Sequence, residues 1–129
     1  MAELSILIID DDADFLGLME TRLSSWGYKV FLAQNEAHGI ESVKKDKPDI
    51  VILDYKLPDK DGVTVLKEIR KIDPKLPVVM LTAYPQENTQ HDAGKLGISA
   101  FVPKLSSFQD MHTSLKSVID MISKQLKKD

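Results

Sequence analysis

Leu4-Ser-Ile-Leu-Ile-Ile-Asp-Asp-Asp12 is the stretch of sequence that decides the fold. Its apolar residues are mostly β-branched and run on almost without interruption, so the stretch lacks the alternation of a strand with one solvated face. The run stops abruptly at three aspartates. This pattern is typical of a short strand buried on both faces, as strands are in a parallel sheet covered by helices.

The sequence that follows repeats the order of strand and helix. Asp12 is a candidate N-cap for a helix with apolar residues at helical spacing, and Gly27 is expected to end that helix. The apolar residues of this helix are Leu16, Met19, Leu23 and Trp26. Further strands are predicted at 29–33, 49–54, 77–81 and 99–102, and further helices at 36–45, through 65–69 up to Asp73-Pro74, at 86–96 and at 108–126.

Five strands that alternate with five helices predict a doubly wound α/β fold. The five-stranded parallel sheet is expected to carry helices on both faces and right-handed crossover connections. A length of 129 residues is close to the commonest domain size, and no internal repeat or linker divides the chain. We therefore expect residues 1–129 to form one domain.

Composition excludes several classes of function. The 17 Lys and Arg residues against 20 Asp and Glu give a net charge of -3, so no broad basic surface is expected to bind nucleic acid directly. The absence of cysteine excludes disulfides, thiolate zinc sites and thiol catalysis. The longest apolar runs, such as Ile6 to Ile9, have four residues, too few for a membrane span or a signal peptide. These features predict a cytoplasmic protein with no membrane segment.

The carboxyl ends of the predicted strands are the expected place for a site, since ligands of open parallel sheets bind there. The second strand ends in Ala33-Gln34 and offers no reactive group, which fits an edge position in the strand order 2-1-3-4-5. The other four strands end in reactive side chains. These are Asp10 and Asp11 after the first strand, Asp54 after the third, Thr82 after the fourth and Lys104 after the fifth.

Three carboxylates at one edge repel one another, and a bound cation would remove that repulsion. Oxygen ligands favour Mg²⁺, which binds at about 2.0–2.1 Å in octahedral geometry, and Mn²⁺ is expected to substitute for it. A carboxylate-bound Mg²⁺ beside a hydroxyl and a lysine is an arrangement suited to phosphoryl groups. Asp54 lies on the strand predicted between the first and the fourth, so it is the expected nucleophile.

One combination of motifs covers nearly the whole chain. It consists of Ile8-Ile9-Asp10-Asp11, Ile52-Leu53-Asp54, Leu57-Pro58 followed by Asp61-Gly62, Leu81-Thr82-Ala83, and Lys104 after Phe101. In this combination the sequence resembles the receiver domain of two-component response regulators, a flavodoxin-like fold. The resemblance implies a phosphoacceptor that takes a phosphoryl group from the phosphohistidine of a sensor histidine kinase or a phosphotransfer protein. It also implies that the domain is no enzyme beyond its own phosphorylation and dephosphorylation.

The resemblance implies a role for each site residue. Asp54 is the phosphoacceptor. The metal ligands are Asp10, Asp11, Asp54 and the backbone carbonyl of Lys56. Lys104 pairs with the phosphate, Thr82 binds a phosphoryl oxygen and acts as a switch, and Phe101 is the switch aromatic, although an aromatic residue in a short strand is also typical of the core.

Two departures from the family pattern lead to separate expectations. Leu105 follows the site lysine where the family usually has proline, so we predict a trans Lys104–Leu105 peptide bond, with a cis Val102–Pro103 bond as the alternative. The fifth strand reads Ser99-Ala-Phe101 and lacks the charges of receivers that dimerise to bind DNA, so that dimer is not expected.

Phe15 and Leu18 are surplus to the apolar stripe of the first helix. We predict that they form a docking surface for the phosphoryl donor, and the alternative is that they only widen the core stripe. Two other functions remain open: a receiver-like binding module that takes no phosphate, and a hydrolytic phosphotransferase with an aspartyl nucleophile. The second would need another acid to activate water, and Asp54-Tyr55-Lys56 lacks one. Asp10 and Asp11 alone could equally cap the first helix.

Overall fold

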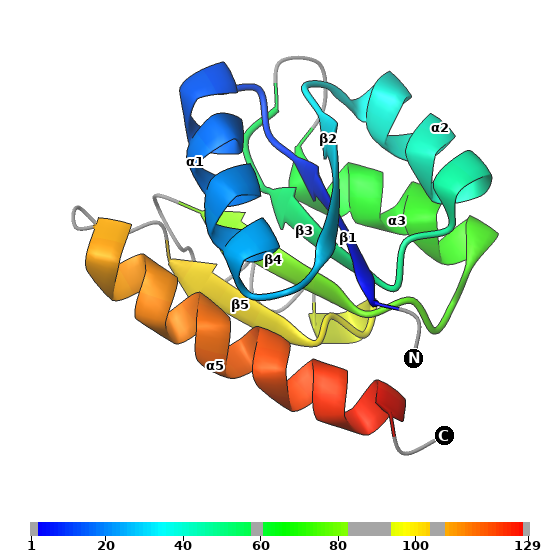
Figure 1. Ribbon diagram of the computed structural model, residues 1–129. Coiled ribbons are helices and arrows are strands. Elements are labelled where there is room, and N and C mark those ends of the chain that lie inside the picture. The colour runs from blue at the N-terminus through cyan, green and yellow to red at the C-terminus, as the bar shows by residue number, and fades with distance from the viewer. Residues whose placement is uncertain (1–2, 58–60, 83–93, 104–107, 128–129) are drawn as a thin grey trace.

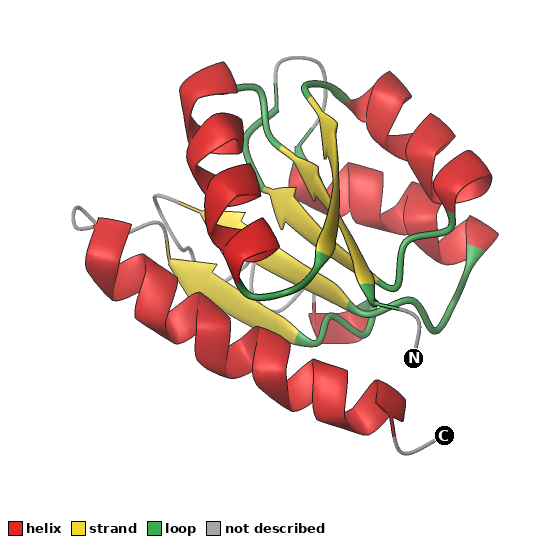
Figure 2. Ribbon diagram, in the orientation of Figure 1, coloured by secondary structure: helices red, strands yellow, loops and turns green. Residues whose placement is uncertain are grey.

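The computed structural model describes residues 3–57, 61–82, 94–103 and 108–127 (Figure 1). Within these residues, strands and helices follow one another in the order expected from the sequence (Figure 2). The elements are β1 (Ser5–Ile9), α1 (Ala13–Ser25), β2 (Lys29–Ala33), α2 (Glu36–Asp46), β3 (Ile50–Asp54), α3 (Gly62–Ile72), β4 (Val78–Thr82), β5 (Ala100–Pro103) and α5 (Phe108–Lys127).

The five strands form one parallel sheet in the order β2-β1-β3-β4-β5. This confirms the predicted order, with β2 at an edge and β3 at the centre. Helices α1 and α5 cover one face of the sheet, and α2 and α3 cover the other (Figure 1). The helix predicted at 86–96 lies mostly outside the described residues, so the structure describes four of the five expected helices.

The core has two layers because both faces of the sheet are covered. Alternate residues of β1 face opposite layers: Ile6 and Ile8 pack with α1 and α5, and Leu7 and Ile9 pack with α2 and α3. None of these four side chains has exposed surface. Burying a large aliphatic side chain contributes roughly 1.5–3 kcal/mol, so both faces of the strand stabilise the fold. This double burial explains the uninterrupted apolar runs in the sequence.

Helix α1 begins and ends where the sequence predicts. The Asp12 carboxylate is the N-cap and accepts hydrogen bonds from the backbone N–H groups of Asp14 and Phe15, at 3.0 and 3.2 Å. Gly27 follows the helix with φ of +93° and donates its N–H to the Ser24 carbonyl. Only glycine adopts this backbone conformation without steric cost, so it ends the helix.

Arg70, on α3, holds together the chain segments on either side of β4. Its Nε donates to the Leu96 carbonyl at 2.6 Å, and its Nη1 donates to the carbonyls of Leu76 at 2.7 Å and Asp73 at 3.2 Å. Its Nη2 donates to the Gly97 carbonyl at 3.1 Å. Burial lowers the pKa of Arg70, and the nearby Asp73 carboxylate opposes that change. The guanidinium nevertheless stays charged at any physiological pH.

We expect Arg70→Met to lower the free energy of unfolding by about 2–3 kcal/mol, because several carbonyls are left without a charged donor while the aliphatic stem is kept. Urea denaturation measures this change. The matched control is Lys71→Met, at an exposed neighbouring position of α3, which should change stability by less than about 0.5 kcal/mol. Equal destabilisation by the two variants would show that the hydrogen bonds of Arg70 contribute nothing to stability.

Candidate functional site

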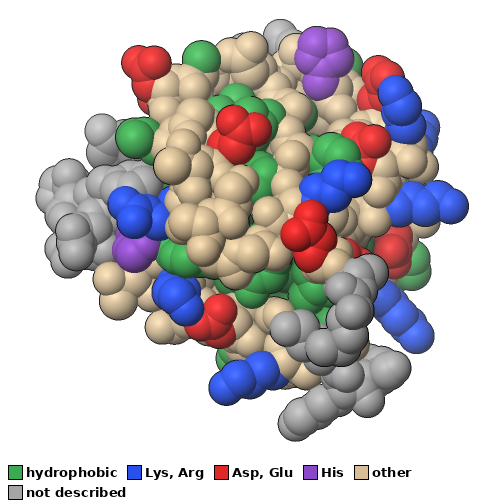
Figure 3. Space-filling view, viewed as in Figure 1, with side chains coloured by type: hydrophobic (Ala, Val, Ile, Leu, Met, Phe, Trp, Pro, Cys, Tyr) green, Lys and Arg blue, Asp and Glu red, His purple; other side chains and the backbone are tan. Residues whose placement is uncertain are grey.

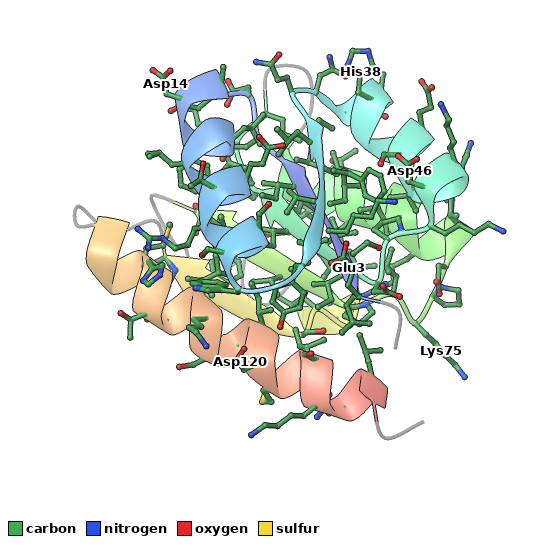
Figure 4. The ribbon with its side chains drawn as sticks, viewed as in Figure 1. Glu3, Asp14, His38, Asp46, Lys75 and Asp120 are labelled. Atoms are coloured by element: carbon green, nitrogen blue, oxygen red, sulfur yellow. The ribbon has the colours of Figure 1, made fainter. Side chains whose placement is uncertain are left out.

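Three aspartates meet at the carboxyl end of the sheet. Asp10 follows β1 with 1% of its surface exposed, and Asp54 is the last residue of β3 with 6% exposed. Asp11 is exposed beside them. One carboxylate oxygen of each residue lies within 4.8 Å of the other two. In Figure 4 the labelled Asp14, in the first turn of α1, marks the end of the molecule at which the strands end.

Backbone groups hold the buried Asp10 in place. Its N–H donates to the Ala33 carbonyl at 3.0 Å, and its Oδ1 accepts the N–H of Asp12 at 2.9 Å. Asp12 therefore both caps α1 and orients the Asp10 carboxylate. Since the N-cap is Asp12, the alternative that Asp10 and Asp11 serve as the helix cap is wrong.

Thr82 is the last residue of β4, the strand next to β3. Asp54 pairs with Leu81 in the β3–β4 register, so Thr82 is one residue further along the neighbouring strand, and 4% of its surface is exposed. Lys56 is exposed, and its N–H lies 3.4 Å from Asp54 Oδ1. The sheet thus brings Asp10, Asp54 and Thr82 to one edge, as the sequence predicts.

Lys104 lies outside the described residues, and so does its peptide bond to Leu105. The residue before it, Pro103, pairs with Thr82 in the β4–β5 register. The described residues contain no cis peptide bond, so the Val102–Pro103 bond is trans and the alternative of a cis bond there is wrong.

The remaining predicted residues divide between core and surface. Phe101 is half-buried, pairs with Met80 and packs on the α2–α3 side of the sheet, which confirms its place in the core and leaves its switch role a prediction. Phe15 is half-buried against the α1–α5 core, whereas Leu18 is 55% exposed. Of the two docking candidates, Phe15 therefore widens the core stripe and Leu18 lies on the surface.

The chemistry of the aspartate cluster fits a hard divalent cation. Its donors are carboxylate oxygens, and the chain has no cysteine to favour zinc. The three oxygens lie within 4.8 Å of one another, close enough for side-chain rotation to bring all three to one cation. Exposure of Asp11 leaves that side open to the water ligands that Mg²⁺ retains.

The structure explains why the residue at position 62, next to this site, is glycine. A Cβ at Gly62 would lie 2.7 Å from Tyr55 Cα and 3.1 Å from the Asp54 carbonyl oxygen. The first helical residue of α3 therefore touches the end of β3 directly. The sequence identifies Asp61-Gly62 only as part of a family motif. It cannot predict the close contact of Gly62 with Tyr55, because a contact between two elements produces no periodic pattern in the sequence.

Comparison with known proteins agrees with this geometry. The family described as response regulator receiver domain matches residues 6–116. Transcriptional regulatory protein ZraR from Klebsiella oxytoca is 32% identical over 117 residues, which cover 91% of this chain and 26% of that protein. Probable transcriptional regulator ycf27 from Porphyridium aerugineum is 32% identical over 124 residues, which cover 96% of this chain and 51% of that protein. The chain thus spans about a quarter to a half of the length of these relatives.

A solved structure extends the similarity to the fold. The crystal structure of a response regulator receiver domain protein (CheY-like) from Methanospirillum hungatei superposes with a TM-score of 0.84 at 26% identity, and the match covers 96% of this chain and 99% of that one. No helix among the described residues is long and apolar enough to cross a membrane.

Proposed function

Because the chain belongs to the response regulator receiver domain family of two-component signalling, we propose that Asp54 accepts a phosphoryl group from a phosphohistidine. The donor is a sensor histidine kinase or a phosphotransfer protein, which are the partners of this family. The proposal takes residues 1–129 as one receiver domain. The carboxylate cluster of Asp10, Asp11 and Asp54 is the observation that carries it, since it joins the expected acceptor to the expected metal ligands.

The reaction is an in-line transfer to a carboxylate. An Asp54 carboxylate oxygen attacks the phosphorus atom and forms the O–P bond, while the N–P bond of the phosphohistidine breaks and its electron pair returns to the imidazole, which takes up a proton. In dephosphorylation a water oxygen attacks the phosphorus, and the Asp54 carboxylate leaves. Since both steps take place on Asp54 itself, the proposed catalysis is limited to the domain's own phosphorylation and dephosphorylation, and the domain is not an enzyme in the ordinary sense.

The carboxylates of Asp10, Asp11 and Asp54 and the Lys56 carbonyl would hold the Mg²⁺ ion. Bound there, Mg²⁺ or Mn²⁺ would supply positive charge next to the phosphoryl oxygens. Lys104 pairs with the phosphate, and Thr82 donates its hydroxyl to a phosphoryl oxygen. The phosphoryl group carries about -1.5 to -2 charge in place of the single negative charge of the Asp54 carboxylate, and its oxygens draw the Thr82 hydroxyl toward Asp54 and change the surface near Phe101.

Output through direct nucleic-acid binding is not part of this proposal. The net charge is -3, and Figure 3 shows acidic and basic side chains interspersed over the face in view, without a continuous basic area. The proposal places the domain in the cytoplasm, as the sequence predicts. The match to ZraR, which is named a transcriptional regulatory protein, covers 26% of that protein.

Incubation with acetyl phosphate, with and without Mg²⁺, tests the proposal. Intact-mass spectrometry should show the gain of one phosphoryl group with Mg²⁺ and none in excess EDTA. A receiver-like binding module would gain no mass under either condition. A hydrolytic phosphotransferase would consume acetyl phosphate over many turnovers without a lasting adduct.

The docking role of α1 gives a separate prediction, for which Leu18 is the better residue because it is 55% exposed. We expect Leu18→Ala to slow transfer from a sensor kinase about fivefold, because a truncated apolar side chain weakens the complex with the donor. Transfer from acetyl phosphate, which needs no docking, should keep its rate. The rates are measured with a kinase whose phosphohistidine the wild-type domain accepts.

The control for this prediction is Leu32→Ala, at a 40% exposed leucine on β2. This variant should match wild type with both donors, since β2 lies at the edge of the sheet and carries no residue of the site. Equal slowing of Leu18→Ala with both donors would mean that Leu18 supports the fold and not the complex.

A further inference from the structure

Helix α3 starts in direct contact with the end of the acceptor strand. A Cβ at Gly62 would lie 2.7 Å from Tyr55 Cα, 3.1 Å from the Asp54 carbonyl oxygen and 3.3 Å from Met80 Cε. The two shortest contacts are to backbone atoms, which cannot move aside by rotating a side chain. Gly62 is not among the described glycines with positive φ, so the requirement is for space and not for an unusual backbone angle.

Backbone contacts join both described ends of the connection from β3 to α3. The Gly62 N–H donates to the Tyr55 carbonyl, and Lys56 forms an isolated antiparallel bridge with Asp61. The Lys56 N–H also lies 3.4 Å from Asp54 Oδ1. The backbone of Lys56 is thus held between the acceptor carboxylate on one side and the start of α3 on the other.

Helix α3 is held in place by its N-cap and by its packing on the sheet. The Asp61 carboxylate caps it by accepting the Thr64 N–H at 2.8 Å. In the next turns Val65, Leu66 and Ile69 have no exposed surface and pack on the sheet. A Cβ at Gly62 would therefore have to shift the start of α3 or the end of β3, and either shift changes the connection that contains Lys56.

We propose that Gly62 is a positioning residue for the cation site, because it allows α3 to hold the Lys56 carbonyl at the distance that Mg²⁺ requires. This inference rests on the proposed function, in which that carbonyl joins the three carboxylates as a ligand. Mg²⁺ demands near-ideal octahedral geometry at about 2.0–2.1 Å, whereas Ca²⁺ accepts flexible geometry at about 2.3–2.6 Å. A displaced carbonyl should therefore weaken Mg²⁺ binding more than Ca²⁺ binding.

The test is Gly62→Ala, with Mg²⁺ and Ca²⁺ titrated separately and binding followed by amide chemical shifts of the isotope-labelled protein. We expect the Kd for Mg²⁺ to rise at least about tenfold, as for other residues that orient metal ligands. The Kd for Ca²⁺ should rise by less than about threefold, so cation selectivity changes. Val65→Ala is the matched control: it opens a cavity three residues further along the same helix and adds no atom next to Tyr55, so it should leave both constants within about twofold of wild type.

A pair of variants at Asp61 tests the same inference if Gly62→Ala does not fold. Asp61→Ala and Asp61→Asn remove the same charge, but only asparagine keeps an oxygen that caps α3. We expect Asp61→Ala to weaken Mg²⁺ binding about threefold relative to Asp61→Asn, because the uncapped first turn no longer holds the Lys56 bridge.

The outcomes separate this inference from the proposed function. The inference alone would be overturned if wild type incorporates a phosphoryl group and binds Mg²⁺, but Gly62→Ala keeps the wild-type selectivity between Mg²⁺ and Ca²⁺. No difference in Mg²⁺ affinity between the two Asp61 variants would overturn it in the same way. The same decrease of Mg²⁺ affinity in Val65→Ala would also overturn it, since general destabilisation would then explain the effect. A wild-type protein that binds no Mg²⁺ would overturn the metal site and this inference together.

Discussion

Asp54→Asn is expected to abolish phosphoryl incorporation from acetyl phosphate in the presence of Mg²⁺. The amide has nearly the shape of the carboxylate but carries no charge and is a poor nucleophile, so the in-line attack on phosphorus cannot occur. Asp54 lies on the central strand with 6% of its surface exposed, between the strands that carry Asp10 and Thr82. Intact-mass spectrometry of the treated variant should show only the unmodified protein.

The control for this prediction is Asp12→Asn, which also removes a negative charge from the same end of the sheet. Asparagine is a good N-cap, so α1 keeps its hydrogen bonds to Asp14 and Phe15. This variant should still incorporate a phosphoryl group. A phosphoryl group on Asp54→Asn would mean that another carboxylate is the acceptor, and peptide mass spectrometry would identify it.

Asp54→Asn is also expected to stay folded without metal, since asparagine keeps the shape of the side chain and an Oδ1 that can accept the Lys56 N–H. Thermal unfolding in EDTA checks this. The measurement also excludes misfolding as the cause of the missing phosphorylation, because a variant that is stable and inactive lacks the chemistry and not the structure.

The strands could be predicted from the sequence because burial on both faces leaves a local signal. The predicted strand at 49–54 is observed as Ile50–Asp54, and the one at 77–81 as Val78–Thr82. Parallel strands also place their carboxyl ends at one edge, so the meeting of Asp10, Asp11 and Asp54 followed once the strands were recognised. The observed bounds of these two strands differ from the predicted ones by one residue, because hydrogen bonds to the neighbouring strands determine where a strand begins and ends.

Features that depend on contacts between distant elements could not be predicted in the same way. Helical spacing places both Phe15 and Leu18 beside the apolar stripe of α1, but the packing of the α1–α5 layer decides that Phe15 is half-buried and Leu18 exposed. The need for glycine at Gly62 depends on Tyr55, across the connection from β3 to α3. The switch roles predicted for Thr82 and Phe101 rest on family resemblance alone, since a hydroxyl or an aromatic ring in a strand has no distinctive local pattern.

The second large effect concerns Asp11, which we expect to contribute most to Mg²⁺ affinity. Asp10 is 1% exposed and its Oδ1 accepts the Asp12 N–H, and Asp54 is 6% exposed and is the proposed phosphoacceptor. The exposed Asp11 carboxylate can rotate to bind the ion directly. Asp11→Ala should therefore raise the Kd for Mg²⁺ at least about tenfold, as measured by isothermal titration calorimetry. An unchanged titration would show that Asp11 is no direct ligand.

Asp14→Ala separates direct ligation from the general attraction of negative charge. Asp14 is exposed in the first turn of α1, so this variant removes a charge at the same end of the molecule and leaves the ligands of the cluster intact. Its Kd for Mg²⁺ should rise by no more than about twofold in physiological salt, where exposed charges are screened over about 8 Å. If Asp11 acts by binding the ion, raising the Mg²⁺ concentration should restore acetyl phosphate transfer in Asp11→Ala, because the acceptor Asp54 is intact. If transfer stays low at saturating Mg²⁺, Asp11 has a second role in orienting the phosphoryl group.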